Sequence, residues 1–193
     1  MIYGSPKKLP DGRYYLKVQT DEGNRCMIQL NNTTLLTKFS EGDEVTLSLT
    51  EKSVEKIITI NRHNLESAKE HSQEWFGKEV SEKTLETAYT PSLSDDTMIV
   101  GKATVHKNIV TKCYDHEKNS VDLDTVEEGV KSDVMVEFSG LWFMKKTYGP
   151  IWRIAQMRLK APPKKIYPDE YLFNDSDGDD NSNTAEETDE DYI

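Results

Sequence analysis

Hydrophobic and polar residues alternate along several short stretches of the chain, which is the period of half-buried β-strands. In the first of them Tyr14, Leu16 and Val18 alternate with Tyr15, Lys17 and Gln19, and a turn at residues 21–24 leads into a second alternating stretch. The pattern predicts strands over residues 13–20, 25–30, 44–50, 98–105, 109–114, 134–144 and 151–160, and we expect residues 56–60 to extend the same sheet.

The period changes to a helical one between residues 63 and 90. One face of a first helix would carry Leu65, Ala68, Trp75 and Phe76. Asn64 is placed to cap its beginning and Gly77 to end it. Ser81 is placed to cap a second, shorter helix, which Pro91 would stop. We therefore expect a helical insertion at about residues 63–90.

The order of these elements indicates a mainly β, α+β fold. Three or four strands precede the helical pair and four follow it, so strands and helices do not alternate as a parallel α/β sheet requires. Short antiparallel meanders with one helical insertion are typical of a small closed barrel. The sequence therefore predicts a small closed antiparallel β-barrel domain over residues 1–168.

The charge of the chain is concentrated in its last segment. The net charge is −11, and residues 169–193 alone contain eleven acidic residues and no Lys or Arg, while the rest of the chain balances 24 basic against 24 acidic residues. Such a segment is too polar to pack, so we expect a disordered acidic tail. An aromatic and an aliphatic residue follow its last acids, and we expect a partner protein to bind Asp189, Glu190, Asp191, Tyr192 and Ile193.

Several kinds of chemistry find no support in the sequence. No run of 18 apolar residues occurs and the N-terminal residues do not have the pattern of a signal peptide, so we expect an intracellular protein of cytoplasm or nucleus that binds no membrane. Cys26 and Cys113 stand apart from any metal-ligand spacing. With no catalytic motif recognisable, we expect a protein that is not an enzyme and that needs no cofactor or metal.

The window from Phe138 to Pro168 contains no acid and seven basic residues, interleaved with Trp142, Tyr148 and Trp152. Bases of a single strand stack on aromatic rings while Lys and Arg hold the phosphates, so this mixture is typical of a surface that binds single-stranded nucleic acid. The alternative is that both tryptophans are buried across a hairpin and that the lysines form an ordinary solvated edge.

The predicted nucleic-acid-binding residues follow from the expected strand faces. Uninterrupted alternation after Ile151 would place Trp152 outward with the later even-numbered residues, and the outward face of residues 13–20 has a similar character. Tyr-Gly-Pro at 148–150 is expected to lie in the turn before that strand. The predicted set is Tyr15, Lys17, Arg25, Lys145, Lys146, Tyr148, Trp152, Arg158 and Lys160.

These features together resemble a known class of protein. A β-rich domain with a helical insertion, a basic-aromatic face and an acidic C-terminal segment is similar to the OB-fold single-stranded-DNA-binding proteins with an acidic tail, particularly the T7-phage type. The segments EWFGKEVSEKTLETAYTPSL (residues 74–93) and GLWFMKKTYGPIWRIAQMRL (residues 140–159) also resemble small proteins of nucleocytoplasmic large DNA viruses. The resemblance implies single-stranded-DNA binding in viral or phage-like DNA replication or recombination, with a polymerase or helicase as a partner of the tail.

The sequence is therefore compatible with two classes of function. In the first, the protein coats single-stranded DNA, and the acidic tail inhibits the free protein and recruits partners. In the second, it is a structural or interaction protein of a large DNA virus, either a minor virion component or an acidic chaperone, that binds no nucleic acid. The sequence leaves a homodimer open in both classes.

Overall fold

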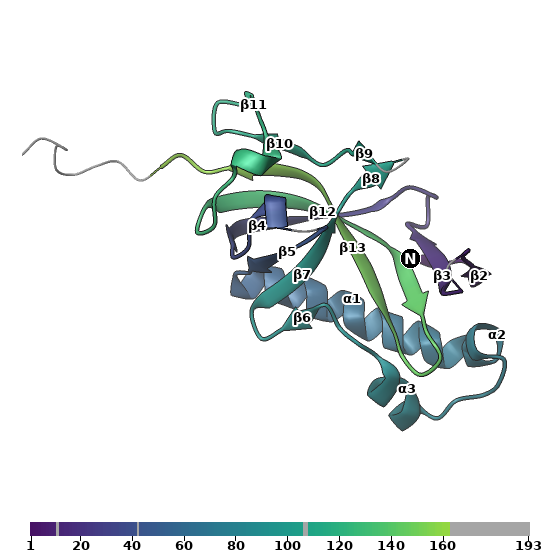
Figure 1. Ribbon diagram of the computed structural model, residues 1–193. Coiled ribbons are helices and arrows are strands. Elements are labelled where there is room, and N and C mark those ends of the chain that lie inside the picture. Colours follow the sequence, from purple (N-terminus) through teal and green to yellow (C-terminus); the bar gives the residue numbers. More distant parts are fainter. Residues whose placement is uncertain (11, 42, 106–107, 163–193) are drawn as a thin grey trace, which may run out of the picture. The chain divides into compact units, whose positions relative to one another are not determined.

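Five strands close on themselves in the computed structural model of the chain, which describes residues 1–10, 12–41, 43–105 and 108–162 (Figure 1). They are β4 (Cys26–Leu35), β5 (Glu44–Ser48), β7 (Thr97–Lys102), β12 (Lys131–Phe143) and β13 (Tyr148–Leu159). β12, β4, β5 and β7 are neighbours in that order, and β13 pairs with both β7 and β12 and so closes the ring. All these pairings are antiparallel except that of β7 with β13.

The connectivity of the ring is that of a Greek key. β4, β5 and β7 follow one another along the chain, and the fourth strand, β12, returns to lie beside the first. A five-stranded Greek-key barrel is the architecture of the OB fold. The predicted fold class, a mainly β OB-like barrel with a helical insertion, is therefore confirmed.

Short strands extend the sheet beyond the ring. β3 (Tyr14–Gln19) pairs with the last part of β12 and carries β1 (Ile2–Tyr3) and β2 (Lys7–Lys8). β10 (Lys112–Tyr114) pairs with β13 and with β11 (Ser120–Val121). The remaining elements are β6 (Leu93–Ser94), the pair β8 (Thr104–Val105) and β9 (Asn108–Ile109), and the short helices η1 (Phe39–Glu41) and η2 (Leu123–Thr125).

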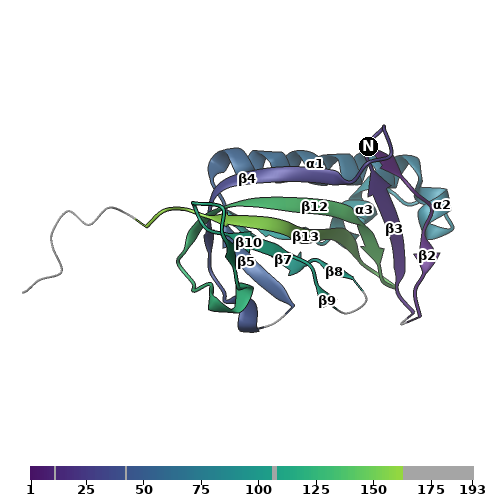
Figure 2. The ribbon, with the colours of Figure 1, turned by 90° about the horizontal axis from the view of Figure 1, so that it is seen from above.

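The helical insertion begins earlier than the sequence predicted. It consists of α1 (Glu51–Glu70), α2 (Ser72–Phe76) and α3 (Glu82–Ala88), and Figure 2 shows α1 running beside β4. The expected strand at 56–60 is thus wrong, because these residues belong to α1. The buried residues of α1 are Ser53, Ile57, Asn64 and Ala68, whose spacings of four, seven and four residues keep them on one helical face.

The predicted boundaries within the insertion are partly confirmed. Gly77 ends α2 with a left-handed φ of 71°, and the Ser81 hydroxyl caps α3 by accepting the Thr84 amide. Asn64, however, is not a cap but a buried residue in the middle of α1. Its side chain accepts from the Tyr3 hydroxyl at 2.8 Å and donates to the Tyr89 hydroxyl at 2.9 Å, which provides the polar partners that its burial requires.

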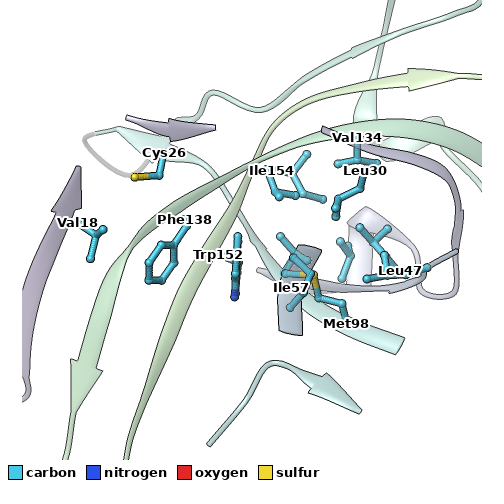
Figure 3. Packing of buried hydrophobic residues seen from close by; sticks show 14 of the residues in the cluster. Val18, Cys26, Leu30, Leu47, Ile57, Met98, Val134, Phe138, Trp152 and Ile154 are labelled. Atoms are coloured by element: carbon cyan, nitrogen blue, oxygen red, sulfur yellow. The ribbon is translucent and has the colours of Figure 1, made fainter. Parts of the chain in front are cut away.

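Side chains fill the barrel. Figure 3 shows residues of the ring strands meeting there, among them Leu30, Met98, Val134 and Ile154, with Ile57 of α1 beside them. Both cysteines are buried free thiols. Burial raises the pKa of the Cys113 thiol to about 11, so this side chain is a core residue and not a reactive thiolate.

A β-bulge changes which residues of β13 point inward. Met135 pairs with Gln156 and Val136 pairs with Ile154, so Ala155 is the extra residue. Trp152 and Ile154 are buried before the bulge and Met157 is buried after it. The sequence predicted an uninterrupted alternation, so it placed Trp152 on the wrong face.

The hairpin between β12 and β13 is also tighter than expected. β13 already begins at Tyr148, which pairs with Phe143, and Pro150 pairs with Leu141 within the ladder. The prediction that Tyr-Gly-Pro forms the turn is therefore wrong. Pro150 is tolerated because β7 pairs with β13 only from Arg153 onward, so the strand has one ladder neighbour at this point.

Candidate nucleic-acid interface

Two of the three aromatic residues in the predicted binding set, Trp152 and Tyr148, are in the core. Trp152 is 3 % exposed and lies against Phe138, with ring centroids 5.0 Å apart (Figure 3). Tyr148 is fully buried, with its ring between those of Phe76, Tyr89 and Phe143. Neither ring offers a face to a base, and this corrects the prediction for both residues.

The two predicted cations near the end of β13 share one carboxylate. Arg158 and Lys160 each approach Asp133 Oδ2 at 2.6 Å, and Asp133 also accepts the Asn32 amide. Burial alone would raise the pKa of the Asp133 carboxyl, but the hydrogen bonds from Lys160, Arg158 and the Asn32 amide lower it to about 2. Arg158 and Lys160 therefore serve the structure of the barrel end, where one of their two charges is neutralised.

The other predicted cations lie at separate places on the surface. Arg25, just before β4, has its guanidinium 3.5 Å from the Glu137 carboxylate; the arginine side chain is exposed and the glutamate side chain is largely covered. Lys17 is exposed on β3, opposite Gly140 of β12. Lys145 and Lys146 are exposed at the tip of the β12–β13 hairpin. The structure thus brings Tyr15 and Lys17 together on β3 but does not assemble the predicted set into one surface.

A groove on the outer side of the sheet collects a different set of aromatic residues. It has a volume of about 620 Å³ and is lined by residues of β3, β7, β12 and β13, including Tyr14, Tyr15, Ile99, Trp142 and Arg153. We call it the aromatic groove. Leu141 and Phe143, the neighbours of Trp142, point to the opposite face, where Phe143 meets Trp75 and Phe76 of α2. Trp142 is therefore directed away from the helices and is only partly buried.

Tyr15 and Trp142 occupy directly opposite positions of β3 and β12. Each ring lies over a glycine. A Cβ on Gly140 would be 2.8 Å from Tyr15 Cε2, and a Cβ on Gly149 would be 3.0 Å from Trp142 Cζ2. The Tyr15 hydroxyl donates to the Ser139 carbonyl at 2.6 Å, which fixes the ring across the sheet. The two glycines thus let both rings lie close to the backbone.

Exposed apolar side chains surround the rings of Tyr15 and Trp142. Leu9, Tyr14, Ile99 and Met144 are all more than a third exposed and line the groove, although Tyr14 was expected to point inward. Solvent exposure of several apolar side chains in one hollow is typical of a binding surface.

Arg153 contributes positive charge to the wall of the aromatic groove. Burial raises the pKa of the Tyr15 hydroxyl, and the charge of Arg153 partly opposes this rise. Arg13 lines the groove as well, and Glu44 is an acid in its lining. The groove therefore combines partly exposed rings with two arginines, at a place where the phosphates and bases of a single strand could both be contacted.

The site prediction missed most of the residues that line the groove, among them Arg13, Tyr14, Ile99, Trp142 and Arg153. Trp142 lies between the buried residues Leu141 and Phe143, so the alternation of the sequence carried a signal for its outward position. For Arg153 no such signal was present in the sequence, because the bulge at Ala155 places Arg153 rather than Trp152 on the outer face.

Some predictions fall outside the described residues. Residues 169–193, with the predicted partner-binding residues Asp189, Glu190, Asp191, Tyr192 and Ile193, belong to this part of the chain, and their role stays a prediction. Within residues 1–162, apart from the four gap residues, no cluster of three His, Cys, Asp or Glu side chains is placed to hold a metal ion. No helix in that part is long and apolar enough to cross a membrane.

The fold and the groove define an OB-like barrel protein with an aromatic groove on its outer sheet face. The chain belongs to a family of unknown function, DUF5871, whose model matches residues 32–175. This match covers the helical insertion and the whole barrel except residues 26–31 at the start of β4. No curated protein matches the sequence.

Two solved structures have a distant likeness to this chain. One is the single-stranded DNA-binding protein from bacteriophage Enc34 in complex with single-stranded DNA, with a TM-score of 0.48 and 9 % identity over 84 % of this chain and 98 % of that chain. The other is a C-terminal truncation of the same phage protein, with a TM-score of 0.44 and 9 % identity over 84 % of this chain and 97 % of that chain. Similarity at this level does not define a shared function.

Proposed function

We propose that the protein binds single-stranded DNA in the aromatic groove. The observation that carries this proposal is the pairing of Tyr15 with Trp142, two partly exposed rings in opposite positions on adjacent strands. Stacking of a base on an aromatic side chain contributes about 1–3 kcal/mol and tolerates any sequence, since every base has a π-face. Two adjacent rings provide a platform for consecutive bases.

The position of the groove on the barrel supports the same function. OB folds bind oligonucleotides on the face of their second and third strands and with the loops that join strands one to two and four to five. In this barrel those strands are β5 and β7, which contribute Glu44, Ile99 and Gly101 to the groove. The loop between the fourth and fifth strands is the hairpin after β12, which begins with Met144.

Positive side chains beside the rings would hold the phosphates. Arg13 and Arg153 line the groove, and Lys17 lies two residues after Tyr15. We expect these residues to replace the predicted contacts of Trp152, Tyr148, Arg158 and Lys160. Arg25 is paired with the largely covered carboxylate of Glu137, and we expect it to contribute little to DNA binding.

Tryptophan fluorescence tests the proposal directly. Trp142 and Trp152 both border the groove, but Trp152 is buried, as is Trp75, whereas Trp142 is partly exposed. Binding of oligo(dT) should therefore quench mainly Trp142. The substitution Trp142→Phe should remove most of the quenching while keeping a stacking ring and much of the affinity. Titrations at several salt concentrations should show weaker binding at higher salt. Absence of binding even at low salt would contradict the proposal.

The wider role rests on the sequence. Acting in DNA replication or recombination, the protein would coat exposed single strands, and the acidic segment 169–193 would compete with DNA for the cations and recruit a polymerase or helicase through Asp189–Ile193. Deleting residues 175–193 should then tighten DNA binding, most clearly at low salt where screening is weak. The double substitution of Tyr192 and Ile193 by Ala should lose the partner and spare DNA affinity.

One observation favours the second class, a structural or interaction protein without nucleic-acid binding. Trp152 and Tyr148, on which the expected DNA face depended, are core residues, as that class requires. The same titration separates the two classes. A folded protein whose Trp142 fluorescence does not respond to oligo(dT) at low salt would belong to the second.

A further inference from the structure

A second hollow lies on the other side of the β12–β13 hairpin from the aromatic groove. It has a volume of about 590 Å³ and lies between the hairpin tip and the helices α2 and α3. We call it the helix-side hollow. Tyr14 and Met144 line both this hollow and the aromatic groove, so these two side chains form the ridge that separates them.

The floor of the helix-side hollow is apolar. Trp75, Phe76 and Leu85 come from the helices, and Phe143 and Tyr148 come from the hairpin. Their rings pack against one another: Phe143 is stacked on Tyr148 with centroids 5.8 Å apart, and Phe76 meets both edge to face at 5.6 and 5.4 Å. The ring faces are therefore occupied by other rings. Such a floor accepts an apolar side chain but offers no free ring on which a nucleobase could stack.

The rim of the helix-side hollow is positively charged. Lys78 follows α2, and Lys145 and Lys146 lie at the hairpin tip, while no Asp or Glu among the described residues lines the hollow. None of the three lysines forms an ion pair or side-chain hydrogen bond with another residue of the described chain. Three cations of this kind around an apolar floor are complementary to an occupant that carries carboxylates beside an apolar group.

One polar group at the floor lacks a partner. The Tyr148 hydroxyl is buried and makes no hydrogen bond to any described residue. Buried hydroxyls are nearly always hydrogen-bonded, and leaving one without a partner costs about 1–3 kcal/mol. An occupant with a carbonyl or carboxylate group would supply an acceptor. This observation is independent of the charge at the rim.

We propose that the helix-side hollow binds an acidic peptide segment of a partner protein, with an aromatic or aliphatic side chain on the floor and carboxylates against Lys78, Lys145 and Lys146. A peptide fits better than a single strand of DNA, because phosphates could use the lysines but bases could not stack on the floor. The site does not depend on DNA binding in the aromatic groove. Because the two hollows share the Tyr14–Met144 ridge, a bound peptide would lie next to the bound DNA.

A synthetic peptide provides the probe. We would titrate the full chain with a dodecapeptide of Asp and Glu residues around a central Phe-Leu pair, at low salt, and follow backbone amide signals by NMR. Shifts should concentrate at residues 75–88 and 143–148. Two control peptides, one with Phe-Leu replaced by Ser-Ser and one with the acids replaced by Gln, should bind at least about tenfold more weakly, because each lacks one half of the complementarity.

A pair of charge reversals locates the site. Lys78 lines only the helix-side hollow, whereas Lys83 is exposed on α3 and lines neither hollow. Lys78→Glu should weaken peptide binding about tenfold and leave oligo(dT) affinity unchanged, while Lys83→Glu should change neither. Loss of DNA binding with intact peptide binding, as expected for Trp142→Ala, would show that the two sites are separate.

Several results would overturn the assignment. Equal peptide binding by the Lys78→Glu and Lys83→Glu variants, or shifts centred on Trp142 and Tyr15, would place the peptide elsewhere. No binding at low salt would remove the site. Changes in the same amide signals without added peptide, on dilution or on removal of residues 169–193, would identify a second copy or the chain's own acidic segment as the occupant.

Discussion

Tyr15 and Trp142 lie directly opposite each other on antiparallel neighbouring strands, and each ring lies over a glycine of the adjacent strand. The arrangement holds the two rings on one face of the sheet, with Arg153 on the wall beside them. In the proposed complex, a base stacked on one ring would bring the next base within reach of the other. The predictions on DNA binding therefore start from this pair rather than from Trp152.

Replacing Trp142 by Ala should weaken binding of oligo(dT) by about 1–3 kcal/mol, because a stacking surface is lost. The free energy of unfolding should change much less, since the side chain is only partly buried. Fluorescence anisotropy of a labelled oligonucleotide and urea unfolding measure the two effects.

Trp152→Ala is the matched comparison. Its side chain is 3 % exposed, so truncation should lower the free energy of unfolding by about 3–5 kcal/mol through a cavity in the barrel. If Trp152→Ala instead stays as stable as the original and loses DNA affinity, the assignment of the two tryptophans is reversed.

Arg153→Gln should make DNA binding less dependent on salt. Each phosphate contacted on a single strand contributes about −0.7 to the slope of log K against log salt, so removing one contact should reduce the slope by about that amount. Arg158→Gln should leave the slope unchanged, because Arg158 is bound to Asp133 at 2.6 Å. Equal effects of the two variants would mean that DNA reaches the far end of β13.

Asp133 should make stability depend on pH in the acid range. The pKa of its carboxyl is about 2 in the folded protein and is lower than the ordinary value of 3.8, so its contribution is complete above about pH 4 and is lost as the pH falls towards 2. Asp133→Asn should lower the free energy of unfolding at pH 7 by about 2 kcal/mol. Urea unfolding should show this difference shrinking between pH 4 and pH 2. A difference of the same size at both pH values, or one equal to that of the exposed Glu55→Gln, would contradict the ion-pair account.

Gly140→Ala should destabilise the sheet where β3 meets β12. An added Cβ would lie 1.9 Å from the Leu16 carbonyl oxygen, which is backbone and cannot rotate away. We expect a loss of about 3 kcal/mol in the free energy of unfolding, together with weaker DNA binding as Tyr15 is displaced. Gly4→Ala, whose Cβ would lie 3.3 Å from the Lys17 carbonyl oxygen, should lose much less. Thermal unfolding of the two variants distinguishes these outcomes.

The sequence predicted helices and strands correctly where one face is clearly apolar and where the residue at the boundary interacts only with its close neighbours in the chain. Ser81 and Gly77 work through hydrogen bonds and dihedral angles within a few residues, so their roles could be read directly. The structure of residues 56–60 could not be predicted in this way. Ile58 and Ile60 have the spacing of a strand, whereas Ile57 and Ile60 have the spacing of a helix, and only the packing of α1 on the barrel decides between the two.

The candidate site was harder to predict than the fold because of one residue. The bulge at Ala155 leaves no mark in the hydrophobic pattern, since Ala fits either face, yet it decides whether Trp152 or Arg153 points outward. The partnership of Arg158 and Lys160 with Asp133 was equally hidden, because Asp133 lies 25 and 27 residues away along the chain. Tyr15 and Lys17 were predicted on the correct face, since β3 has no bulge between Tyr14 and Gln19.

The position of β13 at the end of the barrel sequence determines when the barrel can close during synthesis of the chain. β13 is the last barrel strand to leave the ribosome, yet it has β12 on one edge and β7 and β10 on the other. Until it emerges, the nascent chain presents the edges of β7 and β12 without partners, and such edges pair readily with other chains. A translational pause that occurs when β12 has emerged and β13 is still inside the ribosomal exit tunnel would prolong this exposure. Codon choice C-terminal to the β12–β13 hairpin, which is translated at that stage, should therefore affect the yield of soluble protein more than codon choice in α1.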